Sequence, residues 1–248
     1  MTHVHVVGFG MGPHQLTGEA GQALSRSDYV VAVRKGADDA LLEVRRQICR
    51  EHKLELVELA DPSRDRDDPV DYPGAVASWH QARVDRYAEV LAVRGGTAAW
   101  LVWGDPSLYD SHLRILEQLA RRIELTWDVV PGISAPQILA ARHRIVLHAV
   151  GQPVHVTTAR RLPEALDQDQ RNIVVMLGSE RSLDHLQPWG DWQIWWGANL
   201  GTTSEQLVSG RIDEVLPTIR SAREVARRAA GWVMDTYLLR GPQTGAGQ

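Results

Sequence analysis

The stretch that decides the fold covers residues 98–110 and reads Ala-Ala-Trp-Leu-Val-Trp-Gly-Asp-Pro-Ser-Leu-Tyr-Asp. Its first six residues are apolar without alternation, which predicts a strand buried on both faces, and such strands are typical of parallel sheets. The strand stops abruptly at Gly104, Asp105 and Pro106, which read as a tight polar turn. In open α/β sheets ligands bind beyond the carboxyl ends of the strands, so we expect this turn to border a binding site.

The beginning of the chain is organised in a similar way. An apolar run from Val4 to Val7 leads into the glycine-rich loop Gly8-Phe9-Gly10-Met11-Gly12-Pro13, and Thr17 is placed to cap a helix that reaches Leu24. A strand, a glycine-rich loop and a helix in this order are typical of the opening of a nucleotide-binding fold, although alternate glycines also serve any tight turn.

An NADP-dependent oxidoreductase is one function that this opening allows. The dinucleotide fingerprint needs a third glycine where this chain has Pro13, and an acidic residue about twenty positions further on to bind the ribose. The predicted strand from Tyr29 to Val33 ends in Arg34 instead. An arginine there could accept a ribose phosphate, so the sequence disfavours this function without excluding it.

The rest of the chain predicts a second unit. Leu125 to Val130 is expected to form a strand that ends in Pro131-Gly132-Ile133-Ser134, and Ser134 is placed to cap the helix that follows. Further on, short helical patterns separate strand-like segments at 154–158, 172–177, 192–196, 206–209 and 232–239. We therefore predict two α/β domains, residues 1–132 and 133–240, and a disordered tail over 241–248.

Composition excludes several classes of protein. The 248 residues are 44% hydrophobic, which suffices for a globular core. No apolar run approaches the roughly 20 residues of a membrane span, and the chain opens on a strand pattern rather than a signal peptide, so we expect a cytoplasmic protein with no membrane partner. The 27 basic and 31 acidic residues are interspersed and give a net charge of −4, which provides no field to attract nucleic acid.

No metal site is expected from the sequence. The single cysteine, Cys49, excludes an internal disulfide and offers no paired spacing for zinc. His3 and His5 share a strand face, and His143 and His148 flank a turn, but neither pair shows a zinc-ligand set.

The motifs resemble those of the tetrapyrrole (precorrin) methylase family. Five segments fall in that family's order: the glycine-rich loop, Gly104-Asp105-Pro106, Pro131-Gly132-Ile133-Ser134, and residues 174–178 and 198–203. Longer stretches at 102–111, 151–158 and 235–240 resemble the branch that methylates carbon 1 of precorrin-5 and releases acetate on the aerobic route to cobalamin. The resemblance implies two α/β domains with a cofactor cleft between them that binds S-adenosylmethionine, a tetrapyrrole substrate, and a homodimer.

Carried over by position, the resemblance also implies the residues of the site. The implied cofactor contacts are Met11, Gly104, Asp105, Ser134, Ala135, Leu177 and Ala198. The carboxylates of the substrate call for arginines, and the candidates are Arg142, Arg144, Arg160 and Arg161. Asp105 is the candidate catalytic carboxylate, because Arg34 stands where relatives commonly place an aspartate and a guanidinium does not deprotonate.

Two further alternatives stay open at this point. One is a tetrapyrrole methylase-like enzyme with another acceptor, such as a different precorrin or a peptide. The other is a non-catalytic S-adenosylmethionine-binding protein. Arg34 suggests the second, and so does the glycine-rich loop, in which Gly12 meets Pro13 directly where the family usually has an acidic residue.

Overall fold

The computed structural model describes residues 2–34, 40–62 and 72–242, and within these ranges the chain forms two units. The units are Met1–Ile133 and Ser134–Gln248. Of the predicted disordered tail, residues 243–248 lie outside the described ranges. None of the helices in those ranges is both long enough and apolar enough to span a membrane.

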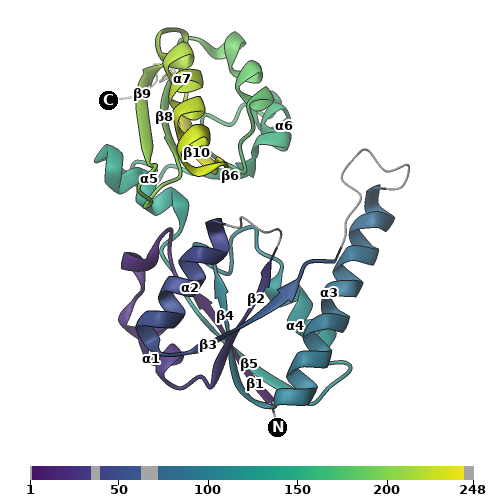
Figure 1. The fold of residues 1–248 in the computed structure, drawn as a ribbon. Coiled ribbons are helices and arrows are strands. Elements are labelled where there is room, and N and C mark those ends of the chain that lie inside the picture. Colours follow the sequence, from purple (N-terminus) through teal and green to yellow (C-terminus); the bar gives the residue numbers. More distant parts are fainter. Residues whose placement is uncertain (1, 35–39, 63–71, 243–248) are drawn as a thin grey trace. The chain divides into compact units, whose positions relative to one another are not determined.

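Unit 1 contains one parallel five-stranded sheet with helices on both faces (Figure 1). Its elements are β1 (Thr2–Gly8), η1 (Pro13–Gln15), α1 (Gly18–Ser25), β2 (Tyr29–Arg34), α2 (Ala40–His52), β3 (Glu55–Ala60), α3 (Tyr72–Arg94), β4 (Gly96–Val102), α4 (His112–Leu119) and β5 (Leu125–Val130). The strand order is β3-β2-β4-β1-β5, and every pairing is parallel. The parallel sheet predicted from residues 98–103 is thus confirmed, with β4 in its centre.

The two faces of this sheet carry separate apolar cores. Val4, Val6 and Trp100 pack with α3 and α4, whereas Val7 and Leu101 pack with α1 and α2. Successive side chains of β4 point alternately into the two cores. This explains why β4 has no polar position from Ala98 to Val102. Figure 1 shows α1 and α2 on one side of the sheet and α3 and α4 on the other.

Local side-chain bonds start the helices that follow the glycine-rich loop and β4. The Thr17 Oγ1 atom accepts a hydrogen bond from the Ala20 backbone N–H (3.1 Å), as the sequence predicts. Before α4, the Oδ1 atom of Asp110 accepts a hydrogen bond from the His112 backbone N–H (2.7 Å), while the Ser111 side chain makes no cap.

Unit 2 contains a mixed five-stranded sheet. Its elements are α5 (Ala135–His143), β6 (His155–Thr158), η2 (Ala159–Arg161), α6 (Leu162–Asp167), β7 (Asn172–Met176), η3 (Arg181–Trp189), β8 (Gln193–Ala198), β9 (Gln206–Arg211), α7 (Ile212–Ala230) and β10 (Asp235–Arg240). The order is β6-β7-β10-β8-β9; β6 and β7 are parallel and the other pairs are antiparallel. α6, η3 and α7 cover one face, and α5 packs against β8, β9 and β10.

The last strand begins later than the sequence predicts. We expected it from Trp232, but β10 begins at Asp235. The side chain of Asn199 donates to the Trp232 carbonyl (3.2 Å) and accepts from the Met234 N–H (2.9 Å). These backbone groups are therefore occupied by a side chain, and they do not join the strand ladder.

Candidate functional site

Three parallel strands of unit 1 end at glycines that touch one another. Gly8 closes β1, and Gly104 and Gly132 follow the neighbouring strands β4 and β5. A Cβ atom added to Gly8 would lie 2.6 Å from the Gly132 nitrogen, and one added to Gly132 would lie 2.1 Å from the Gly104 carbonyl oxygen. No side chain fits at Gly8 or Gly132 without a shift of the backbone. Bare backbone therefore forms the surface at the carboxyl ends of these three strands, which we call the carboxyl edge of unit 1.

The glycine-rich loop is tied to the turn after β4. Gly10 and Gly104 form an isolated antiparallel bridge, in which the Gly104 N–H donates to the Gly10 carbonyl (2.8 Å). Both glycines have left-handed backbones, with φ values of 75° and 73°, which side chains rarely adopt. Met11 is buried, and its N–H donates to the Gln15 side chain (2.8 Å). The structure thus brings Met11, Gly104 and their loops together at the carboxyl edge of unit 1.

Asp105 links the turn after β4 to the turn after β5. Its Oδ2 atom accepts from the Gly132 N–H (2.9 Å), and its Oδ1 atom accepts from both the backbone N–H and the hydroxyl of Ser107. Partial burial raises the pKa of Asp105, but the hydrogen bonds from Ser107 and Gly132 outweigh it, and the pKa lies below its ordinary value. A carboxylate stabilised in its ionised form is a weak base, so this geometry suits positioning better than proton transfer.

A second carboxylate, Asp110, follows this turn in the chain. Asp110 pairs with the His112 ring through Nδ1 (2.8 Å), and His112 Nε2 lies 3.5 Å from the Tyr87 hydroxyl. Burial raises the pKa of Asp110, but the bonds from His112 bring it below its ordinary value. Burial also raises the pKa of Tyr87 to about 12. The Asp-x-His spacing of residues 110–112 was the sequence signal for the carboxylate–imidazole pair. Tyr87 comes from α3 and could not be inferred from that spacing.

The strand order argues against an NADP site. In the dinucleotide-binding fold the second strand lies beside the first, so that its final residue reaches the ribose of a cofactor bound at the first loop. Here β4 lies between β1 and β2, which places Arg34 two strand spacings, about 10 Å, from β1. Arg34 instead faces Glu58 on β3, with Nε 3.7 Å from Oε2.

In unit 2, the predicted residues Leu177 and Ala198 flank the start of β10. Leu177 follows β7, has a left-handed φ of 55° and is 61% exposed, while Ala198 ends β8 and is buried. Their successors both bond to the chain at β10: the Asn199 N–H donates to the Met234 carbonyl (3.0 Å), and Gly178 N lies 3.4 Å from the Asp235 carbonyl oxygen. The structure therefore places Leu177 and Ala198 on either side of the first residue of β10, at the same end of the strands of this sheet.

Ser134 and Ala135 begin α5. Ser134 is the N-cap residue, as predicted, and both residues are buried. The side-chain oxygen of Gln137 accepts from the Ser134 backbone N–H and from its hydroxyl, at 2.8 Å each. The Ser134 hydroxyl thus has a partner within the chain.

The four candidate arginines belong to two segments of unit 2. Arg142 lies in α5 and donates to Glu205 (2.9 Å), and the exposed Arg144 caps the end of the same helix. Arg160 and Arg161 lie in η2, where Arg161 forms a two-pronged bond with Glu164. Any carboxylate ligand would compete with Glu205 for Arg142 and with Glu164 for Arg161.

A buried ion pair in unit 2 was not predicted. The Arg223 Nε atom donates to Asp235 Oδ2 (3.0 Å), and the Asp235 side chain is fully buried. A Cβ atom at Gly178 would lie 2.7 Å from Asp235 Oδ1, which has no hydrogen-bond partner among the described residues. An aspartate two residues before the apolar run 237–239 was the signal for this pair.

Both the sequence and the fold of the chain have known relatives. Residues 3–216 match the family described as tetrapyrrole (corrin/porphyrin) methylases. Over 251 residues, the chain is 41% identical to a precorrin-6A synthase [deacetylating] from Sinorhizobium sp, which covers 97% of this chain and 95% of that protein. A cobalamin synthesis related protein, CobF, from Corynebacterium diphtheriae is 34% identical with a TM-score of 0.83, covering 98% of this chain and 100% of that structure. A uroporphyrin-III C-methyltransferase from Thermus thermophilus, complexed with S-adenyl homocysteine, shares the fold with a TM-score of 0.64 at 18% identity, over 96% of this chain and 97% of that one.

Proposed function

Since this chain belongs to the tetrapyrrole (corrin/porphyrin) methylase family, we propose that it is an S-adenosylmethionine-dependent precorrin methyltransferase of cobalamin synthesis. Its reaction is the methylation of precorrin-5 at carbon 1 with release of acetate, which forms precorrin-6A. The observation that carries this proposal is the likeness to a precorrin-6A synthase along nearly the full length of both chains.

The chemistry of the carboxyl edge of unit 1 fits the proposed cofactor. S-adenosylmethionine carries a sulfonium cation, an amino-acid tail and an adenosine, which together call for backbone hydrogen bonds and a nearby negative charge. Gly104 supplies backbone without a side chain, and Asp105 supplies a carboxylate whose ionised form is stabilised. We assign the cofactor contacts to Met11, Gly104 and Asp105 in unit 1 and to Ser134, Ala135, Leu177 and Ala198 in unit 2.

In the proposed reaction the protein acts mainly by positioning. The cofactor supplies a methyl group that an acceptor carbon displaces in line from the sulfur, and effective alignment of the two reacting atoms contributes much of the rate. Asp105 maintains the geometry of the two turns through Ser107 and Gly132, and its lowered pKa argues against a role as proton acceptor. Arg142, Arg144, Arg160 and Arg161 bind the carboxylates of the tetrapyrrole.

A homodimer in the cytoplasm completes the proposal. β5 is an edge strand of unit 1, and its side chains Trp127 and Val129 are 37% and 44% exposed. Apolar side chains on an exposed edge strand favour burial against another chain. Light scattering coupled to gel filtration measures the mass in solution, and a monomeric mass at micromolar concentration would contradict the dimer.

Binding and turnover test the proposal separately. Calorimetry with S-adenosylmethionine on the full chain should give one site per chain, and the absence of heat would overturn the cofactor assignment. Incubation with precorrin-5 and methyl-labelled cofactor should then place label in the corrinoid and release acetate. Label in a different precorrin, or in a peptide, would retain the cofactor and replace the acceptor.

Arg34 favours a second candidate, a non-catalytic S-adenosylmethionine-binding protein. It stands at the end of β2, where the resemblance leads us to expect an aspartate, and it faces Glu58. Tight cofactor binding without turnover, in the wild type and in Arg34→Asp alike, would support this candidate. Turnover by the wild-type chain would exclude it.

A further inference from the structure

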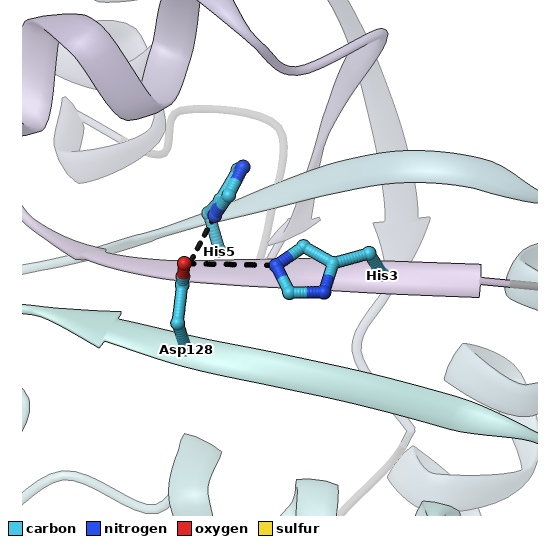
Figure 2. Close-up of side chains that lie close together, drawn as sticks. All are labelled: His3, His5 and Asp128. Carbon is cyan, nitrogen blue, oxygen red and sulfur yellow. Dashed lines mark hydrogen bonds and ion pairs between the residues drawn. The ribbon is translucent and has the colours of Figure 1, made fainter.

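A cluster of potential metal ligands lies in unit 1 away from the glycine-rich loop. Figure 2 shows His3 and His5 of β1 with their rings directed toward Asp128 of β5. The His5 Nδ1 atom lies 2.7 Å from Asp128 Oδ1, and His3 Nε2 lies 3.6 Å from Asp128 Oδ2. One ligand atom from each residue can be chosen so that all three lie within 4.8 Å of one another.

Strand register brings these residues together. His5 is directly opposite Asp128, and His3 is opposite Thr126, in the parallel pairing of β1 with β5. Because side chains alternate along a strand, both histidines share one face, and Thr126 and Asp128 share that face on β5. The cluster lies three to five residues before Gly8. Along a strand this separation is about 10–17 Å, so the cluster is distinct from the proposed cofactor edge.

The hydrogen bonds around the cluster suit metal ligation. The Nδ1 atom of His3 lies 2.8 Å from the Thr126 hydroxyl oxygen. When Nδ1 carries the proton and donates it to that oxygen, Nε2 retains the lone pair that a metal needs, and it is Nε2 that faces Asp128. Histidines that ligate metals commonly donate their other N–H in this way.

The charge and exposure of Asp128 leave its carboxylate available to a metal ion. Within the described part of the chain, Asp128 forms ion pairs with His3 and His5 and with no lysine or arginine. The side chain of His5 is 7% exposed, whereas those of His3 and Asp128 are 32% and 49% exposed. The site is thus anchored on a buried imidazole and open to solvent on its other side, which allows an ion to enter and to retain water.

We propose that His3, His5 and Asp128 bind a divalent transition-metal ion of the zinc class. Two imidazoles and one carboxylate suit zinc and its neighbours, whereas magnesium and calcium prefer sites made of oxygen atoms alone. Ligands about 2.0–2.1 Å from a tetrahedral zinc lie about 3.3 Å apart, so the donors need only small side-chain movements. The fourth position takes water, and His5 gives up any proton on Nδ1 when the metal binds there.

The sequence predicted no metal at His3 and His5 because the third ligand is remote. Asp128 lies 123 residues beyond His5 and joins it only through the pairing of β1 with β5. The bound ion would cross-link the first strand to the edge strand of the sheet, and zinc should therefore raise the melting temperature of the full chain.

Zinc titration of the untagged, chelator-treated full chain tests this inference. Calorimetry should give one zinc ion per chain, and Co²⁺ in its place should give the visible absorption of a four-coordinate site. His3→Gln and Asp128→Asn should each weaken zinc binding at least tenfold. Thr126→Val, which removes only the partner of His3, should weaken it about tenfold. His148→Gln, which removes an exposed histidine of unit 2, is the matched control and should change nothing.

Two results would overturn the metal site. One is the absence of zinc binding up to millimolar concentration in the wild-type chain. The other is zinc binding that His3→Gln and Asp128→Asn leave unchanged. If these variants lower the melting temperature without zinc, while zinc has no effect on the wild type, the cluster is a hydrogen-bonded link between strands and nothing more.

Discussion

Asp105 accepts a hydrogen bond from the backbone N–H of Gly132 over 2.9 Å, although 27 residues separate them in the chain. The bond joins the turn after β4 to the turn after β5, and the end of β1 lies between these strands. It can form because β1 ends in Gly8, where a Cβ atom would lie only 2.6 Å from the Gly132 nitrogen. One carboxylate and three glycines thus determine the shape of the proposed cofactor edge.

Replacement of Asp105 by asparagine should loosen both turns. The amide has one acceptor oxygen where the carboxylate has two, so either Gly132 or Ser107 would face an NH₂ group. We expect a loss of about 1 kcal/mol in the free energy of unfolding, measured in urea at pH 7, because the turn is only partly buried. S-adenosylmethionine affinity should fall as well. Asp169→Asn, at a carboxylate that is 80% exposed, is the control and should leave both quantities unchanged.

The same variant has an expected pH dependence. The pKa of Asp105 is lower in the folded chain than its ordinary value of 3.8, so the ionised carboxylate stabilises the fold. That contribution is fully present only at about pH 5 and above, where the unfolded chain is also ionised at this residue, and it is lost as the pH falls through the folded-state pKa. The difference in unfolding free energy between wild type and Asp105→Asn should therefore shrink between pH 5 and pH 2. A difference that stays constant over this range would contradict the assignment.

Gly132→Ala should displace the turn after β5. The new Cβ atom would lie 2.1 Å from the Gly104 carbonyl oxygen, a backbone atom that cannot rotate away. We expect a loss of about 1–3 kcal/mol or more in unfolding free energy and a loss of S-adenosylmethionine binding. In Gly18→Ala the Cβ atom would meet nothing within 4 Å, at the first position of α1. This control should stabilise the chain by about 0.5 kcal/mol, and equal effects of the two changes would refute the close-packing argument.

Arg223→Met should destabilise unit 2 strongly. It would leave the carboxylate of Asp235 buried without its charge partner, which costs about 3–5 kcal/mol for buried pairs. Arg228→Met removes a surface arginine that is 76% exposed on the same helix, and we expect no change in its melting curve. Restoration of stability by Asp235→Asn in the Arg223→Met background would identify the unpaired charge as the cause. If the double variant is no more stable, lost packing explains the effect instead.

Two substitutions at Asn199 separate its backbone role from its side-chain role. The residue has a left-handed φ of 49° and its buried amide contacts Ser204, Trp232 and Met234. Asn199→Gly retains the backbone freedom and loses the bonds, whereas Asn199→Ala loses both. We expect both to unfold at lower urea concentration, with alanine the worse by about 1 kcal/mol. Equal effects would show that the side-chain bonds alone matter.

Local sequence patterns predicted much of the fold. The run from Ala98 to Val102 has no polar position because both faces of β4 are covered, and that property is visible in the sequence. β5 has the bounds that its apolar ends predicted, and Thr17 caps α1 through an atom three residues away. Strand periodicity and caps depend on residues close in the chain, so a single sequence suffices to read them.

The order of the strands and the partners of the side chains were decided only by the tertiary structure. No pattern in the sequence places β4 between β1 and β2, or directs the Asp105 carboxylate to Gly132 rather than to a ligand. Likewise, His5 acquires Asp128 as a neighbour through a register that follows from burial of Val7 and Val130 in one core. The sequence by itself determined which segments are strands, to within a few residues at their ends, and which family they resemble. The contacts between distant segments required the folded chain, because they arise from the packing of whole faces rather than from any local preference.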